Sequence, residues 1–218
     1  MATKKTEVIE IRPIEIKKVT VRVVGDTPLI MHAWSEKAKR MMLEAQMGIA
    51  KGKKKEVKNP ADDFIRSMYW LTPMPEDGTM ESFEEAIANG ARFGFPVTAF
   101  KQAAISAAYR MGWAKDKMSM RGAFYIDSDE NGMIEIHSDT PEMREDMVKV
   151  GMGSSDLRYR PMFENWYCDL TLSINTGFGM TFDDIINVIN AGGAGVGVGE
   201  WRPERDGIFG MYHVEIVK

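Results

Sequence analysis

Two segments of the chain alternate strictly between apolar and polar residues. Residues 18–24 (KVTVRVV) place three valines on one side and polar residues, Lys18 and Arg22 among them, on the other. Residues 165–175 (NWYCDLTLSIN) repeat the pattern, with a tryptophan, a cysteine and three aliphatic residues on one side. Such alternation is typical of strands that are covered on one face only. A less regular alternation over residues 208–217 predicts the last strand.

Helical spacing of apolar residues lies between these strands. Residues 98–111 repeat alanines and large apolar residues on one face, with Thr98 as the predicted N-cap and Gly112 as the stop. Residues 181–190 predict a second helix, in which Thr181 caps the N-terminus and two aspartates suit the positive end of the dipole. Shorter helices are expected from Ser35 to Gln46, from Asn59 or Asp62 to Tyr69, and from Ser82 to Ala88.

A turn signal lies between two further apolar segments. Residues 121–126 (RGAFYI) and 133–137 (MIEIH) flank Asn131-Gly132, a pair typical of hairpin turns. We therefore expect a β-hairpin over residues 121–137. Residues 141–150 lack alternation and predict a short helix or a turn.

The order of these elements predicts an α+β fold. Strand, helix, hairpin, strand, helix and strand follow the βαββαβ plan of a ferredoxin-like (RRM-like) core, an antiparallel sheet with helices on one face. Residues 25–95 interrupt this order with short helices and turn-rich segments. We interpret them as a mainly helical insertion within a single domain that spans residues 1–218.

The composition is that of a folded protein without membrane spans. The chain has 218 residues, of which 44% are hydrophobic, and five tryptophans. Its apolar runs are short, the N-terminus lacks the apolar stretch of a signal peptide, and Cys168 is the single cysteine. We expect a cytoplasmic protein with no disulfide and no membrane contact.

Charge is distributed unevenly along the chain. The net charge is −4, yet residues 1–60 carry 14 Lys and Arg against 7 Asp and Glu, and the remainder is strongly acidic. A basic segment beside an acidic body is compatible with an anionic ligand or with self-association between unlike surfaces. Solvation of the basic residues is an equally good interpretation.

The segment AGGAGVGVGEWRPERDGIFG (residues 191–210) concentrates seven glycines. Dinucleotide-binding and P-loop sites place their glycines between a strand and the next helix, whereas these follow a helix and precede a strand. The segment suits a close approach of the backbone to a sugar–phosphate chain, with Trp201 available for stacking and arginines for phosphates. In the alternative, Gly192 caps the helix and Arg202 and Arg205 pair with the acids beside them.

The arrangement of helix, glycine-rich segment and final strand resembles the RAMP superfamily of CRISPR-associated proteins. Residues 195–202 (GVGVGEWR) and 206–210 (DGIFG) carry this resemblance. It implies a non-catalytic backbone subunit that coats a guide RNA, assembles side by side into a filament with further protein subunits and serves antiviral defence. A phage-borne or otherwise repurposed relative fits equally well, because fold does not fix function.

Candidate nucleic-acid-binding residues are basic, aromatic or glycine residues at positions that a single strand of RNA or DNA can contact. Outside the glycine-rich segment they are Lys18, Arg22, Lys51, Lys53, Lys54, Lys55, Arg121, Arg158, Tyr159 and Arg160. Within it they are Gly195, Gly197, Gly199, Trp201, Arg202 and Arg205.

The sequence offers little catalytic chemistry. It lacks the HExxH and Gly-x-Ser-x-Gly motifs and a closely spaced His/Asp cluster, so we expect no metal and no cofactor. His32 is a candidate for the general acid or base of a RAMP-type endoribonuclease. The leading hypothesis is a self-assembling RNA-binding subunit. The alternatives are a self-assembling structural protein without nucleic acid, phage-derived in origin, and that endoribonuclease.

Overall fold

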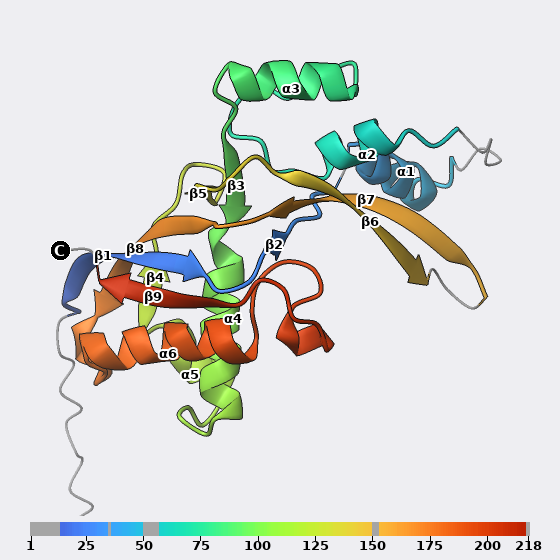
Figure 1. The fold of residues 1–218 in the computed structure, drawn as a ribbon. Coiled ribbons are helices and arrows are strands. Elements are labelled where there is room, and N and C mark those ends of the chain that lie inside the picture. Colours follow the sequence, from blue (N-terminus) through green and yellow to red (C-terminus); the bar gives the residue numbers. More distant parts are fainter. Residues whose placement is uncertain (1–13, 35, 50–56, 150–152, 217–218) are drawn as a thin grey trace, which may run out of the picture.

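The computed structural model describes residues 14–34, 36–49, 57–149 and 153–216. Over these ranges the protein is a mixed α+β fold with antiparallel sheets and six α-helices (Figure 1). The predicted cap at Ser35 and the lysines at 51–55 lie outside the described residues.

The largest sheet has four strands in the order β4-β8-β1-β9, and every neighbouring pair is antiparallel. Its strands are β1 (Ile16–Gly25), β4 (Phe124–Ile126), β8 (Tyr167–Asn175) and β9 (Tyr212–Ile216). The alternation in β1 and β8 is confirmed, because Val21, Val23 and Leu170 are fully buried. The last strand is shorter than predicted, since Ile208 lies in a loop and is exposed.

Two long helices pack against each other and contribute to the core beneath this sheet. In α4 (Val97–Arg110), Phe100 and Ala104 are buried, and Gly112 with a φ of +71° follows the helix end as predicted. The predicted N-cap is wrong. Pro96 takes that position without a side-chain hydrogen bond, and Thr98 lies inside the helix.

The second of these helices, α6 (Phe182–Gly195), begins at the predicted cap. Thr181 and Asp184 form a capping box in which each side chain bonds the other residue's backbone N–H. The helix continues past its predicted end at Asn190, so Gly192 is an interior residue and not a C-cap. Glycine is needed at position 192 because α6 packs tightly against α4. A Cβ there would lie 2.7 Å from the Ala104 backbone nitrogen.

A second sheet has the order β2-β7-β6, from β2 (Leu29–Ile30), β7 (Ser155–Phe163) and β6 (Glu142–Lys149). The prediction of a helix or turn over residues 141–150 is therefore wrong. This segment, PEMREDMVKV, has no apolar alternation, and it becomes a strand because it pairs with β7 along its whole length. Tertiary pairing commonly overrides local pattern in this way.

The predicted hairpin over residues 121–137 is also wrong. Gly132 does make a turn, but β4 pairs with β8, and β5 (Met133–Ile136) pairs with β3 (Phe93–Pro96) in a two-stranded sheet. Arg121 ends a short helix, α5 (Lys117–Arg121), instead of opening a strand. Both strands find longer-range partners that the turn signal does not encode.

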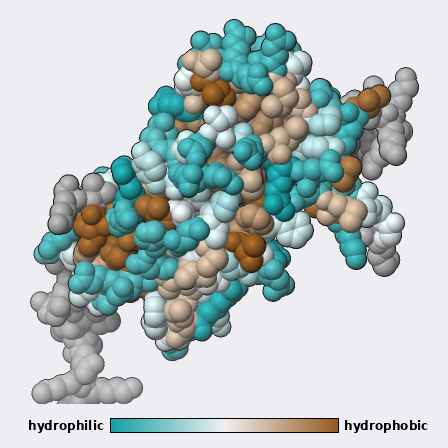
Figure 2. All heavy atoms as spheres, viewed as in Figure 1, coloured by the Kyte–Doolittle hydropathy of each residue, from teal (hydrophilic) through white to brown (hydrophobic). Residues whose placement is uncertain are grey.

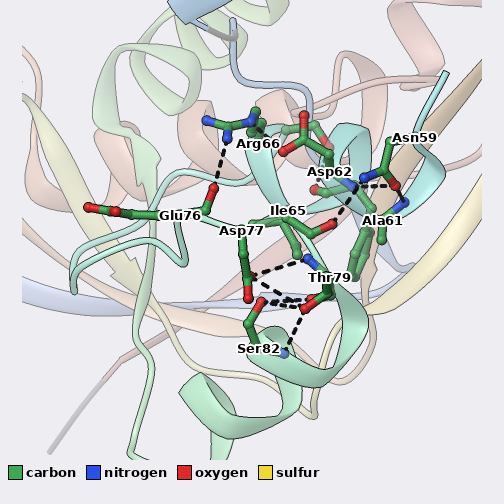
Figure 3. Close-up of polar contacts among 12 residues, drawn as sticks. Asn59, Ala61, Asp62, Ile65, Arg66, Glu76, Asp77, Thr79 and Ser82 are labelled. Carbon is green, nitrogen blue, oxygen red and sulfur yellow. Dashed lines mark hydrogen bonds and ion pairs between the residues drawn. The ribbon is translucent and has the colours of Figure 1, made fainter. Parts of the chain in front are cut away.

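The segment between β2 and β3 holds α1 (Glu36–Gln46), α2 (Pro60–Arg66) and α3 (Met80–Ala88), close to the helices predicted there. Polar side chains set the N-terminal ends of α2 and α3 (Figure 3). Asn59 caps α2 and Thr79 caps α3, while Arg66 bonds both Asp62 and the Glu76 carbonyl.

Apolar residues of this segment join the same core as the four-stranded sheet. The rings of Phe64 and Phe83 lie 5.1 Å apart, and those of Phe93 and Phe163 lie 5.5 Å apart. Because α2 packs against β7, these aromatics connect the helices to the second sheet.

Candidate nucleic-acid interface

The glycine-rich segment leaves α6 and passes along the free side of β2. The Glu200 N–H donates to the Ile30 carbonyl at 2.9 Å, and the Gly210 N–H donates to the Pro28 carbonyl at 2.8 Å. Gly199 has a φ of +77°, and a Cβ there would lie 2.5 Å from the Ile30 oxygen. The glycine at 199 is therefore required by the close approach of two backbones.

One face of the β6–β7 hairpin carries three arginines and one aspartate. Arg144 lies directly opposite Arg160, and Asp146 lies opposite Arg158. Asp146 Oδ1 accepts from Arg144 Nε at 2.9 Å, and its Oδ2 accepts from Arg160 Nη1 at 3.3 Å. We call these four residues the arginine cluster. Asp146 is thus shared by two guanidinium groups, while Arg158 Nε lies 3.8 Å from Asp156 Oδ2.

The cluster is partly buried, and the glycine-rich segment contributes to it. The side chains of Arg160 and Asp146 are only 4% and 5% exposed. Glu200 reaches Arg160 from the glycine-rich segment, with 3.5 Å between Oε2 and Nη2. Phe209 supplies an aromatic ring 4.7 Å from the Arg144 guanidinium carbon. Residues far apart in the sequence thus meet at one site.

His32 stands beside the same cluster. Its Nε2 lies 3.4 Å from Arg158 Nη1, while its Nδ1 is buried and has no hydrogen-bond partner among the described residues. Burial lowers the pKa of His32, the cation of Arg160 lowers it further, and Glu200 opposes the shift. The imidazole is therefore neutral at neutral pH.

Two exposed tryptophans lie close in the sequence to residues of this site. Trp201 follows Glu200 directly, has a φ of +53° and is 39% exposed. A bulky residue in the left-handed region is rare, and a backbone bond from the Phe209 N–H to its carbonyl holds it there. Trp34, two residues after His32, is also exposed. Exposed indole rings are suited to stacking with bases.

The other arginines of the glycine-rich segment lie differently. Arg202 bonds Glu204 and the Gly199 carbonyl, and Glu204 also pairs with Arg110 of α4. Arg202 thereby fixes the loop to the helices. Arg205 is exposed in the short 3-10 helix Pro203–Arg205. The remaining candidate glycines are Gly195 at the end of α6 and Gly197 in the left-handed region.

The candidates on the four-stranded sheet do not join the arginine cluster. Lys18 pairs with Asp127 at 2.7 Å. Arg22 makes two bonds to Asp169, at 2.7 and 2.8 Å, and lies 4.2 Å from the centre of the Tyr167 ring. These cations are already balanced by acids.

Two further candidates lie elsewhere. Arg121 is exposed at the end of α5, where its carbonyl accepts from Lys101. Tyr159 lies opposite Glu145 on the other face of the hairpin, and Ser67 donates to its carbonyl. The run Arg158-Tyr159-Arg160 therefore does not present its aromatic and its cations on the same side.

Sequence reasoning missed Arg144, Asp146 and Phe209, and it considered Glu200 only as a partner of neighbouring arginines. The first two lie in the strand predicted as a helix or turn, and cross-strand pairing alone brings them to Arg158 and Arg160. The two-residue spacing of Arg144 and Asp146 is the one sequence signal that places both side chains on the same face of a strand.

The remaining chemistry is sparse across the part of the chain that the structure describes. No three His, Cys, Asp or Glu side chains there come together as a metal site, and no helix there is long and apolar enough to cross a membrane. Cys168 is buried, which raises the pKa of its thiol far above the usual range. Comparison with known proteins identifies no matching family model and no matching curated protein.

Proposed function

We propose that the protein is a non-catalytic, RAMP-like subunit that binds single-stranded RNA and self-assembles along it. The order β4-β8-β1-β9, with α4 between β1 and β4 and α6 between β8 and β9, supports a ferredoxin-like core. In that plan each helix connects two strands that run in the same direction, with one antiparallel strand between them. RNA is preferred over DNA because of the resemblance described above.

The arginine cluster is the observation that carries this proposal. Three arginines on one face of the hairpin offer phosphate contacts, and the exposed Trp201, which follows Glu200 in the chain, offers a stacking plane. Arginine forks match phosphate geometry better than lysines do. The acidic remainder of the surface can face solvent or neighbouring subunits.

Fluorescence anisotropy with labelled oligouridylate at low salt tests this proposal. We expect binding that weakens as salt rises, because counterions are released. Replacing Trp201 with alanine removes a stacking plane and should weaken binding by about tenfold. Arg158→Gln should weaken binding by several-fold. The matched control Arg92→Gln should not, because Arg92 pairs with Glu135 and is not part of the arginine cluster. No binding by the wild-type protein at low salt would overturn the proposal.

A self-assembling structural protein without nucleic acid is the second candidate. Helix α1 favours self-assembly in either case, because Met41, Met42, Leu43 and Met47 of its region are all about half exposed. Large apolar side chains grouped in this way commonly mark interaction surfaces. An absorbance spectrum of the purified assembly separates the two candidates, since bound RNA raises the 260 nm absorbance.

The endoribonuclease alternative depends on His32. A neutral imidazole can accept a proton, but the nearby arginines disfavour the protonated form, and cleavage needs both a general acid and a general base. Incubating labelled RNA with wild-type protein and with His32→Ala tests it. Cleavage that disappears in the variant would establish this alternative, and absence of cleavage would exclude it.

A further inference from the structure

We propose that Arg158, Arg160 and His32 form a binding site for a single phosphate group, and that the Glu200 carboxylate occupies this site until a phosphate displaces it. The inference rests on the proposed function for the identity of the phosphate carrier, an RNA strand. The site itself is argued from the contacts of four side chains, and it would also accept free inorganic phosphate.

The contacts of Arg160 are incomplete. Its guanidinium is buried, its two carboxylate contacts are 3.3 and 3.5 Å long, and its Nε has no partner among the described residues. Charge-assisted bonds are normally about 2.7 to 2.9 Å long. Arg22 and Asp169 reach 2.7 and 2.8 Å in the same protein. A buried arginine held this loosely has donors left for another anion.

The Glu200 carboxylate can leave Arg160 without a change in the main chain. Its side chain is 41% exposed while Arg160 beneath it is 4% exposed, so it covers the cation from the solvent side. Its backbone N–H is bonded to the Ile30 carbonyl, which fixes the main chain independently of the side chain. A change of rotamer therefore withdraws the carboxylate without moving the loop.

A phosphodiester is a suitable replacement for that carboxylate. Both carry one negative charge, so exchange leaves the charge of the buried site unchanged. A phosphate offers more acceptor oxygens, which can take the free Arg160 donor, an Arg158 N–H and a His32 N–H. Neutral His32 adds a donor without adding a further cation to the cluster.

Glu200→Gln is the main test, and Asp206→Asn is its control. Both changes remove one negative charge from the same loop, but Asp206 is exposed, and its φ of +60° is one that asparagine tolerates. Glu200→Gln should bind oligouridylate about fivefold more tightly than the control, because the internal competitor is gone. Glu200→Asp, which keeps the charge but shortens the reach, should fall between them.

Thermal unfolding in the presence of inorganic phosphate tests the site without RNA. At matched ionic strength, phosphate should raise the Tm of Glu200→Gln more than that of wild type or Asp206→Asn, because it restores an anion beside Arg160. Adding Arg158→Gln to Glu200→Gln should remove both the phosphate stabilisation and the gain in RNA affinity.

The outcomes separate this inference from the proposed function. Equal RNA affinities and equal phosphate responses of Glu200→Gln and Asp206→Asn would overturn the phosphate site, even if the wild-type protein binds RNA. Phosphate stabilisation specific to Glu200→Gln, with no RNA binding by any variant, would support the site and overturn the proposed function. Weaker RNA binding by Glu200→Gln than by the control would show that Glu200 assists the ligand and would also overturn the inference.

Discussion

Two glycines of α6, Gly193 and Gly195, have different roles at the scale of single residues. A Cβ on Gly193 would lie 1.9 Å from the Tyr212 carbonyl oxygen, whereas one on Gly195 would meet no atom within 4 Å. Gly193 therefore sets how closely α6 approaches β9. Gly195 only ends the helix.

Alanine substitution should separate these roles. Gly193→Ala should destabilise the protein by about 3 kcal/mol, because helix and strand must move apart. Gly195→Ala should be neutral or stabilising by up to about 1 kcal/mol, since it lowers the entropy of the unfolded chain and improves helix propensity. Urea unfolding measures both, and equal effects would contradict the packing argument.

His213 of β9 provides a pH-dependent contact. Its Nδ1 lies 2.6 Å from Asp26 Oδ1, and this hydrogen bond raises the pKa of His213 above its usual value, although burial opposes the shift. A raised pKa means that the folded protein binds the proton more tightly than the unfolded chain. The resulting stability is fully present below about pH 6.5 and is lost as pH rises through the folded pKa.

Replacing the histidine should remove this dependence. Wild type should be more stable than His213→Asn near pH 5.5 by about 0.5 kcal/mol, a small value because both side chains are almost half exposed. The difference should shrink near pH 9. A difference that is the same at both pH values, measured by urea unfolding, would exclude the charged pair.

At the scale of elements, those stabilised by neighbouring residues could be predicted, and those stabilised by distant strands could not. The strand over residues 165–175 and the cap at Thr181 could be predicted, because each depends on residues next to one another in the chain. The strand β6 could not, since its residues pair with β7 and its aspartate is buried against arginines instead of apolar groups. The failed hairpin at Asn131-Gly132 has the same cause.

The stability of the β6–β7 hairpin should depend on Asp146. Asp146→Asn removes the charge that Arg144 and Arg160 share, so a buried guanidinium loses its closest anion. We expect a loss of about 3 kcal/mol in the free energy of unfolding. Glu142→Gln, an exposed change on the same strand, is the control and should cost little. Comparable losses for the two variants would show that the shared carboxylate does not stabilise the hairpin.

The candidate site was predictable only in part for the same reason. The sequence identifies His32, Arg158 and Arg160 one by one, but their meeting depends on pairing between β2, β7 and β6. Their contact with Glu200 depends on the path of the glycine-rich segment. Conversely, Lys18 and Arg22 look available in the sequence and are paired with acids in the fold.

At the scale of the whole molecule, exposed acids and exposed apolar side chains concentrate on different helices. Figure 2 shows a mainly hydrophilic face with apolar residues in distinct groups. Helix α3 and the turn before it carry exposed acids, namely Glu76, Asp77, Glu81, Glu84 and Glu85. Helix α1 carries exposed apolar residues beside Lys39 and Arg40. The exposed apolar residues of α1 favour contacts between copies.

Self-association should therefore be sensitive to α1. Leu43→Glu places a charge among exposed apolar side chains and should shift the protein toward the monomer, with an increase of at least about tenfold in the dissociation constant. Met118→Glu on α5 is the matched control, because Met118 is still more exposed but lies on another helix. Light scattering over a range of concentrations measures both, and identical curves for the two variants would exclude α1 as the contact.

The bonds from Glu200 and Gly210 to β2 have a consequence for solubility. β2 is an edge strand of its sheet, and its two residues, Leu29 and Ile30, are fully buried. Open sheet edges of this kind recruit strands from other chains and lead to aggregation. The glycine-rich segment acts as a protective cover here. A substitution that lifts it from β2 should therefore cause aggregation before it causes unfolding.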